Sequence, residues 1–238
     1  MSRKQPLRLV MLLQDLEFGG TQRYAVHLLQ HLDRRLFIPE LWVLRGGMDL
    51  APAARETGAE INWLSGSKKF TVSSLPRLLG RLRQKKPQML YTLTAVPNIW
   101  GRLFGRLTGV PVILSSYRDF NPRQYEKRLW RLSRRIICNA GALKDYLVRH
   151  DRVDPKRIAV VPNAVDTEFF TPSPESRNLA PTIVSIGRLV RQKDPLILLE
   201  AFITAAREIP EARFEFVGDG RLRDRLEVRL RAEALEDR

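Results

Sequence analysis

The sequence predicts an α/β fold with two successive parallel-sheet domains, and three observations support this. Short apolar runs alternate with stretches of helical periodicity along the first 170 residues. A polar segment with three prolines follows at 171–181. A strand–helix–strand pattern then resumes at 182–217. We therefore expect a complete N-terminal Rossmann-like domain over 1–170, a linker over 171–181, and the first βαβα part of a second Rossmann-like domain over 182–238.

The N-terminal domain is expected to contain seven strand–helix repeats. Apolar runs predict buried strands, and leucines at helical spacing predict the helices between them. Strands that are joined by helical crossovers lie parallel, so the repeats predict a doubly wound sheet. The expected strands cover 7–13, 38–44, 60–64, 88–93, 111–116, 135–140 and 158–161, and the expected helices cover 21–32, 49–57, 73–86, 95–108, 123–135 and 142–150.

The second domain begins with a strand at 182–186, followed by a basic loop. Asp194 and Pro195 open a helix there, because aspartate is a good N-cap and proline is tolerated at the first helical position. Pro210 ends this helix, and a second strand and a helix follow at 214–217 and 221–235. The loop cations Arg188 and Lys193 precede a helix N-terminus, where anions bind readily, so a diphosphate is the expected ligand. The alternative is a solvated basic face with no ligand.

Composition limits the class of protein. The chain is 44% hydrophobic, which is typical of a packed globular fold, and no apolar run approaches the roughly 20 residues of a membrane span. The basic and then apolar N-terminus resembles a signal peptide, but it lacks a small-residue cleavage site, so we expect a first strand instead. The one cysteine, Cys138, excludes an internal disulfide and fits a reducing cytoplasm and a core position.

The net charge of +15 is concentrated in one segment. Residues 68–135 carry 16 basic and 2 acidic side chains, whereas the rest of the chain carries 25 and 24. Three expected helices in this segment combine cations with aromatic residues, which favours an anionic membrane surface as the partner. No helix-turn-helix, RNP or zinc-finger pattern supports a specific nucleic acid. For each single helix, the alternative is an ordinary amphipathic surface helix. The aromatic residues are Trp100, Phe104, Tyr125 and Trp130.

Two candidate sites lie at the ends of N-terminal strands. Gly19 and Gly20 form a turn between a strand and a helix that Thr21 is expected to cap, which lets backbone N–H groups approach an anion. Arg118 and Asp119 follow the end of the fifth strand, where side chains face the expected cleft. Arg118 can bind an anionic acceptor, and Asp119 can orient or deprotonate an acceptor hydroxyl. The alternative role of Asp119 is to cap the following helix.

Two motifs of the second domain resemble one enzyme family. The segments GRLVRQKDPLILLEAF and FVGDGRLRDRLE are similar to the retaining GT-B glycosyltransferases of family 4. The resemblance implies that Arg188 and Lys193 bind the diphosphate of a nucleotide-sugar donor. It also implies that Gly218 and Gly220 form the turn that approaches the nucleotide.

The N-terminal domain carries further motifs of the same family. The resemblance implies that Gly19 and Gly20 contact the donor phosphate or the acceptor, and that Arg118 and Asp119 lie near the reacting sugar. The segment VPNAVDTEFF resembles the family's hinge motif, with Asn163 and Asp166 at matching positions. Alanine replaces the usual glycine at position 164, so this turn must avoid a positive φ.

The resemblance implies a sugar transferase that uses a nucleotide-sugar as donor substrate and requires no cofactor or metal ion. The acceptor is expected to be lipid-linked or a cell-envelope polysaccharide, at the cytoplasmic face of the plasma membrane, to which the protein is expected to be peripheral. The family's second domain continues with further strands and a paired-glutamate motif, which 182–238 lacks, so we expect an incomplete enzyme. The alternative function is a non-catalytic module that binds an anion or a membrane.

Overall fold

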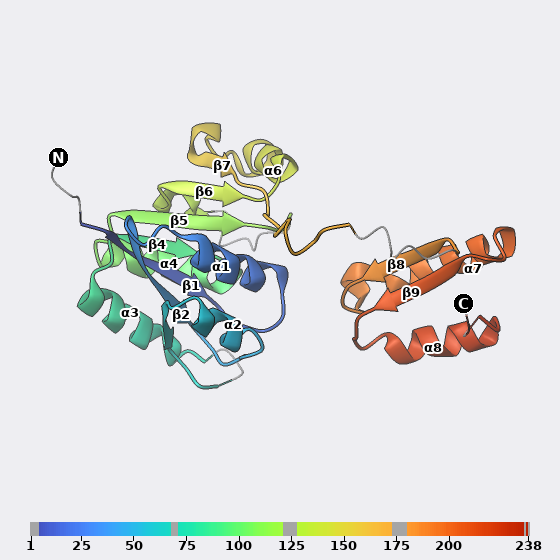
Figure 1. The fold of residues 1–238 in the computed structure, drawn as a ribbon. Coiled ribbons are helices and arrows are strands. Elements are labelled where there is room, and N and C mark those ends of the chain that lie inside the picture. Colours follow the sequence, from blue (N-terminus) through green and yellow to red (C-terminus); the bar gives the residue numbers. More distant parts are fainter. Residues whose placement is uncertain (1–4, 68–70, 121–127, 173–179, 236, 238) are drawn as a thin grey trace. The chain divides into compact units, whose positions relative to one another are not determined.

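The chain forms two compact units, Met1–Val165 and Asp166–Arg238 (Figure 1). The structure is a computed structural model that describes residues 5–67, 71–120, 128–172, 180–235 and 237. The domain limits expected at 170 and 181 stay predictions.

The first unit is built on a seven-stranded sheet with the order β3-β2-β1-β4-β5-β6-β7. Every neighbouring pair is parallel, which confirms the doubly wound sheet predicted from the sequence. The chain moves from β1 to β2 on one side and later returns to place β4 on the other side of β1. Ligands of such sheets bind at the carboxyl ends of the strands near this reversal. The strands are β1 Leu7–Leu13, β2 Phe37–Val43, β3 Glu60–Trp63, β4 Met89–Thr92, β5 Val112–Tyr117, β6 Arg135–Cys138 and β7 Ile158–Val160.

Helices cover both faces of this sheet (Figure 1). Successive strand residues point to opposite faces, so Met11 packs in the cluster with Leu29 of α1, whereas Leu12 packs with Leu78 of α3. Because both faces are buried, the strands are nearly continuous apolar runs. The α-helices of the first unit are α1 Gly20–His31, α2 Ala51–Glu56, α3 Ser74–Lys85, α4 Ala95–Leu107 and α6 Gly141–Asp151, and the short 3-10 helices are η1 Trp130–Leu132 and η2 Pro155–Arg157.

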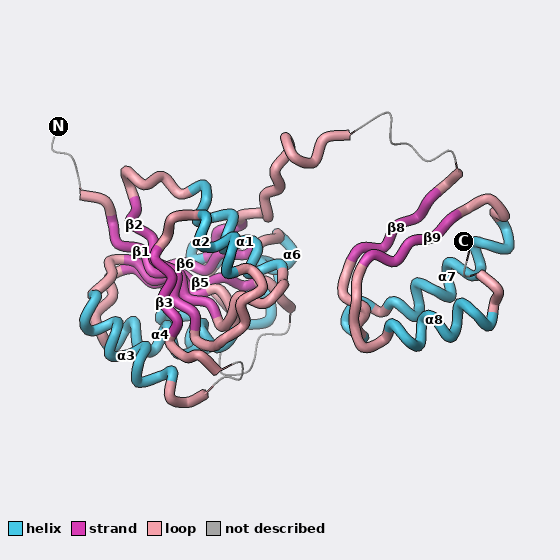
Figure 2. The backbone as a smooth tube through the Cα atoms, turned by 60° about the horizontal axis from the view of Figure 1, so that its bottom comes forward, coloured by secondary structure: helices cyan, strands magenta, loops and turns pink. Residues whose placement is uncertain are grey.

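The second unit is a two-stranded parallel sheet with helices α7 and α8 packed on it (Figure 2). Phe202 of α7 stacks on Phe214 of β9, with ring centroids 4.5 Å apart. Leu199 and Leu226 bring α7 and α8 into the same core. The elements are β8 Thr182–Ile186, the 3-10 helix η4 Arg191–Lys193, α7 Pro195–Glu208, β9 Arg213–Val217 and α8 Arg223–Ala232.

The third basic helix, expected over 123–135, is only partly testable and wrong at its end. Residues 121–127 lie outside the described residues. Beyond them, helical residues 128 and 129 lead into η1, and Ser133 is extended. Arg135 already belongs to β6, because strand pairing buries Ile136 in the core at this point. The helical spacing across 133–135 therefore does not correspond to a helix.

The expectation that cations and aromatic residues of 68–135 face an anionic surface is wrong for Arg102 and for Trp130. Arg102 of α4 is completely buried, and its Nε donates to Ser115 Oγ at 2.8 Å. Trp130 is 8% exposed and packs in the core that contains Cys138. Neither side chain is available to a membrane. Cys138 is buried, which confirms its predicted core position.

Two expected helix caps are absent. Gly19, not Thr21, is the N-cap of α1, and no side chain caps this helix. Asp194 stands at the N-cap of α7, but its backbone is left-handed, with φ +46° and ψ +51°, and its side chain makes no capping hydrogen bond. Pro195 occupies the first helical position as predicted. Asp194 both ends η4 and precedes α7. Its left-handed backbone therefore sets the direction in which the chain enters α7.

Candidate functional site

The turn between β1 and α1 lies at the carboxyl edge of the sheet in the first unit. Gly19 is extended, with φ −172°, and Gly20 begins the helix. A Cβ at Gly20 would meet no atom within 4 Å, so neighbouring side chains leave this backbone accessible. A Cβ at Gly19 would lie 2.4 Å from Oε1 of Gln22, which folds back over the turn. The site therefore combines a helix N-terminus with a backbone that neighbouring side chains leave open at Gly20, as an anion site requires.

Asp15, which the sequence analysis did not name as a site residue, fixes this turn. Its side chain is 5% exposed. Its carboxylate accepts hydrogen bonds from Nη2 of Arg45 at 2.7 Å, Nε2 of Gln22 at 2.8 Å and the backbone N of Glu17 at 3.2 Å. The sequence signal was an acidic residue directly after a buried strand and shortly before a double glycine. Gln22 thus acts as a support for Asp15.

The loops that follow β1, β2 and β3 are joined by backbone hydrogen bonds. Leu16 N donates to Gly47 O at 3.1 Å, and Gly46 N donates to Ser67 O at 2.7 Å. Phe18 N donates to Asp49 Oδ2 at 3.0 Å. The edge around the glycine turn is therefore one connected structure.

Arg118 is brought together at this edge with Asn163, which belongs to the predicted hinge motif. The Nη1 atom of Arg118 donates to Oδ1 of Asn163 at 2.7 Å, and its Nε donates to Oγ of Ser116 at 3.0 Å. The guanidinium carbon lies 3.7 Å from the ring centroid of Tyr24. Segments that are distant in the sequence thus converge on one cation. Tyr24 is a second residue whose site contact the sequence analysis missed, because it fits the apolar stripe of its helix.

Tyr91 of β4 contacts the same cluster through Tyr24. Its hydroxyl lies 3.4 Å from that of Tyr24. Burial raises the pKa of Tyr91 above its usual value, so this phenol stays protonated and holds its hydrogen bond. Asp119, which we expect to orient the acceptor, is exposed next to this cluster. Its catalytic role stays a prediction, and its alternative capping role concerns residues outside the described part of the chain.

The hinge motif adopts the geometry expected for alanine at position 164. The left-handed non-glycine residues of the described chain do not include Ala164, which confirms that its turn avoids a positive φ. Asp166 accepts hydrogen bonds from the backbone N of Glu168 and of Phe169, both at 3.0 Å. Asp166 therefore has a local structural role in the second unit.

The two candidate phosphate ligands of the second unit lie on the loop between β8 and α7. Arg188 follows the strand, and Lys193 ends η4, just before the 14-residue helix α7. Both side chains are exposed. Within the described chain, neither forms an ion pair with an acidic side chain. The loop therefore presents two available positive charges close to a helix N-terminus.

Gly218 and Gly220 are required by a close contact with the same loop. Gly187 N donates to Val217 O at 3.0 Å, and this pairing brings the two loops together. A Cβ at Gly218 would lie 1.9 Å from the carbonyl oxygen of Gly187, and one at Gly220 would lie 2.5 Å from that of Leu189. The glycines thus flank the segment that carries Arg188. Their proximity to a nucleotide stays a prediction.

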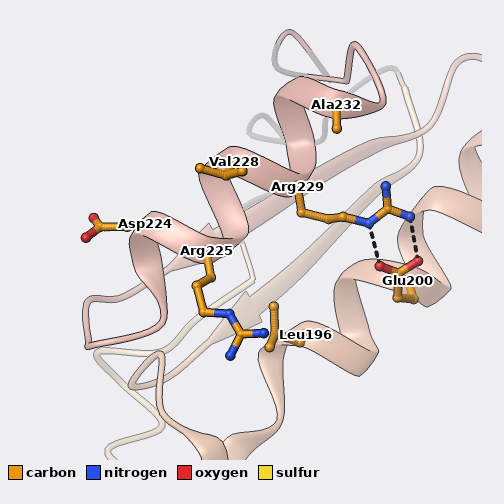
Figure 3. A pocket seen from close by; sticks show the side chains of 7 residues that line it. All are labelled: Leu196, Glu200, Asp224, Arg225, Val228, Arg229 and Ala232. Carbon is orange, nitrogen blue, oxygen red and sulfur yellow. Dashed lines mark hydrogen bonds and ion pairs between the residues drawn. The ribbon is translucent and has the colours of Figure 1, made fainter.

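A separate groove of about 500 Å³ lies between α7 and α8 (Figure 3). Arg229 crosses it and forms an ion pair with Glu200, with Nε–Oε1 and Nη2–Oε2 distances of 2.7 and 3.0 Å. No predicted site residue lines this groove. Its lining consists of Leu196, Glu200, Asp224, Arg225, Val228, Arg229 and Ala232.

The described residues contain neither a metal-binding cluster nor a membrane-spanning helix. Among them, no cluster of three or more histidine, cysteine, aspartate or glutamate side chains is arranged to hold a metal ion. No described helix has the length and apolar character needed to cross a bilayer. Metal independence stays a prediction.

Relatives with known names share sequence with this chain. An Escherichia coli protein named UDP-Gal:alpha-D-GlcNAc-diphosphoundecaprenol alpha-1,3-galactosyltransferase is 30% identical over 175 residues, which cover 63% of this chain and 45% of the relative. One subunit of the human phosphatidylinositol N-acetylglucosaminyltransferase is 34% identical over 103 residues, covering 43% of this chain and 21% of the relative. The chain thus spans less than half the length of these two relatives.

The fold is shared with solved structures. The Anabaena protein Alr3699/HepE, solved in complex with UDP-glucose, matches with a TM-score of 0.79 at 15% identity, covering 98% of this chain and 67% of that one. The lipopolysaccharide outer core galactosyltransferase WaaB matches with a TM-score of 0.67 at 14% identity, covering 98% and 66%. These likenesses confirm the predicted GT-B fold class. The family model for Glycosyltransferase Family 4 matches residues 18–169, so the chain belongs to that family.

Proposed function

We propose that this protein transfers a hexosyl unit from a nucleotide-sugar to a lipid-linked or polysaccharide acceptor. Membership in Glycosyltransferase Family 4 supports a sugar transferase. Named relatives support the acceptor class, since one acts on a diphosphoundecaprenol-linked sugar and others are phosphatidylinositol glycosyltransferases. A solved neighbour in complex with UDP-glucose supports a nucleotide-sugar donor.

The observation that carries the proposal is the pair of available cations on the β8–α7 loop. Arg188 and Lys193 are exposed on the loop that leads into the N-terminus of α7. Cations at such a position stabilise the charge that develops on a departing diphosphate. We infer that they replace the metal ion that other transferases use, and that the reaction proceeds with retention at the sugar.

The acceptor is proposed to bind at the carboxyl edge of the first unit. The turn at Gly19 and Gly20, whose backbone is accessible at Gly20, would face a phosphate of donor or acceptor. Arg118 would bind an anionic part of the acceptor, and Asp119 would orient its reacting hydroxyl or assist deprotonation.

We propose that the protein works on the cytoplasmic side of a membrane, bound to anionic lipid. The cations of 68–135 divide into two groups in the structure. Lys85 forms an ion pair with Glu40, and Arg102 is buried, so these do not contribute to such a surface. Arg81 and Arg118 are half-buried. The exposed cations among the described residues support such a surface; they are Arg77, Arg83, Lys86, Arg106, Arg128, Arg131, Arg134 and Arg135.

The test is the substitution Lys193→Ala in the enzyme, assayed with radiolabelled nucleotide-sugars and a polyprenyl-diphosphate-linked acceptor. Donor turnover should be abolished, whereas sedimentation with anionic vesicles should be unchanged. Lys156→Ala, which removes an exposed lysine of the first unit, is the matched control and should retain turnover. Persistent turnover in Lys193→Ala would show that the phosphate assignment is wrong. Vesicle binding by a protein without any turnover would favour the non-catalytic module instead.

A further inference from the structure

Neutral groups on three separate segments hold Arg118 in the first unit. Its Nε donates to Ser116 Oγ at 3.0 Å, its Nη1 donates to Asn163 Oδ1 at 2.7 Å, and its guanidinium lies over the ring of Tyr24 at 3.7 Å. A hydroxyl, an amide and an aromatic face carry no net charge. Within the ranges that the structure describes, Arg118 makes no ion pair with a carboxylate. Its positive charge is therefore oriented but not cancelled.

We infer that Tyr24 and Asn163 are positioning residues, which with Ser116 form a neutral clamp that fixes Arg118 to bind a phosphate group of the acceptor. The inference rests on the acceptor-side role proposed above for Arg118. It adds the residues that position this cation and the chemical class of group that it selects.

The same unit shows how an arginine with a purely structural role is held. Arg45 donates from Nε and Nη2 to the buried carboxylate of Asp15 at 3.1 and 2.7 Å, and its charge is compensated there. Arg118 has polar contacts of similar length but with neutral acceptors. A guanidinium that keeps its full charge and a fixed plane is suited to a bidentate contact with phosphate. The contrast between the two sites indicates a ligand for Arg118.

Tyr24 connects the clamp to the glycine turn. It lies in the second turn of α1, which begins at Gly20. Its hydroxyl is 3.4 Å from that of Tyr91, which is only 2% exposed, so the ring is tied to the sheet. The ring face attracts the guanidinium through its quadrupole and restricts the plane of the cation. One helix thus carries both the accessible backbone at Gly20 and the platform for Arg118.

The ligand class follows from this chemistry. A neutral sugar hydroxyl gains little from a cation whose charge is uncompensated, whereas a phosphate monoester or diphosphate gains a charge-assisted pair of hydrogen bonds. We therefore expect the site to select acceptors that carry a phosphate next to the sugar over the same sugar without it.

The sharpest test is Asn163→Asp, which keeps the shape of the side chain and adds a charge. The new carboxylate would form an ion pair with Arg118 and compete with the ligand. Inorganic pyrophosphate is titrated by calorimetry into the chain that carries Arg188→Ala and Lys193→Ala, so that the donor loop does not contribute. Asn163→Asp should weaken binding about tenfold or more. The matched control Ala164→Asp, with the same added charge one exposed residue away, should change it by about twofold at most.

A merely structural role of Asn163 predicts the opposite result. An aspartate would strengthen the contact with Arg118, and pyrophosphate would then bind as it does to the parent chain; this result would overturn the inference. In the enzyme, Asn163→Asp should raise the KM for a phosphate-bearing acceptor and leave the KM for the nucleotide-sugar unchanged.

Tyr24 is tested with a pair of substitutions. Tyr24→Leu removes the aromatic face and should weaken pyrophosphate binding about fivefold, whereas Tyr24→Phe keeps the face and should rescue it. Equal binding by the two variants and the parent would overturn the role of Tyr24. Arg118→Ala separates the two levels of the argument: if it binds pyrophosphate normally, the proposed acceptor-side role itself is wrong. If only Arg118→Ala loses binding, that role stands and the clamp is wrong.

Discussion

Replacing Asp15 with alanine should destabilise the first unit by about 2–3 kcal/mol. Its carboxylate is 5% exposed and accepts hydrogen bonds from Arg45, Gln22 and the backbone of Glu17. Removing one partner of a buried ion pair costs about 3–5 kcal/mol. The cost is lower here because Arg45 is 21% exposed and also lies 3.5 Å from a carboxylate oxygen of Glu17, which retains part of the compensation.

Urea unfolding followed by tryptophan fluorescence measures this change in the first unit, because all four tryptophans lie within it. Asp33→Ala is the matched control, since Asp33 forms an ion pair with an Arg35 side chain that is 90% exposed. The control should leave the unfolding midpoint unchanged. If Asp15→Ala shifts the midpoint no further than the control does, the support assigned to Asp15 is refuted. The tryptophans are Trp42, Trp63, Trp100 and Trp130.

Two further predictions concern the second unit and the core of the first. Gly218→Ala should destabilise the second unit by about 3 kcal/mol, because its Cβ would lie 1.9 Å from a backbone oxygen; hydrogen exchange of the α7 amides measures this, and Gly187→Ala, where a Cβ meets nothing, should be mild. Burial raises the pKa of the Cys138 thiol to about 11, so iodoacetamide at pH 9 should label only unfolded protein. Because the raised pKa belongs to the folded state, the thiol's contribution to stability is complete below about pH 9 and is lost between about pH 9 and 11. Rapid labelling of the native protein would contradict the burial, and equal exchange in both glycine variants would contradict the contact.

Hydrophobic periodicity predicted the order of elements well. The strands 7–13 and 182–186 have the predicted limits, since each is a largely apolar run that a proline precedes and a glutamine or a glycine follows. The third basic helix failed at 133–135, where a helical spacing of leucine and arginine overlapped the start of a buried strand. In such a short segment, the spacing of apolar residues does not distinguish a helix from a strand. Pairing within the sheet determines that this segment is a strand.

The sequence pattern did not predict which charged and aromatic side chains are buried. Arg102 has the same helical spacing as its exposed neighbour Arg106, but Ser115 on β5 provides a buried acceptor for it. Nothing in the local sequence indicates that contact, because the partner belongs to another strand. The same reason explains why Trp130 appeared suited to a membrane surface.

The candidate site was predictable in its positions but not in its contacts. The double glycine after a strand and the basic loop before a helix predicted two candidate sites, because turn chemistry is local, and the roles of these residues stay predictions. The convergence of Tyr24, Arg118 and Asn163 depends on strand order, which brings the carboxyl ends of β1, β5 and β7 to one edge. Asp15 was overlooked because its partner Arg45 follows a different strand.

The hydrogen bonds between the loops after β1, β2 and β3 have a consequence for engineering the edge where the acceptor is proposed to bind. Leu16 is hydrogen-bonded to Gly47, and Gly46 to Ser67, through backbone atoms that no substitution other than proline removes. If one loop were replaced alone by that of another family member, its backbone groups would not lie in place to form the hydrogen bonds with the other two loops. We therefore expect that all three loops must be exchanged together. Libraries that vary one loop at a time would consist mostly of variants in which these hydrogen bonds are broken.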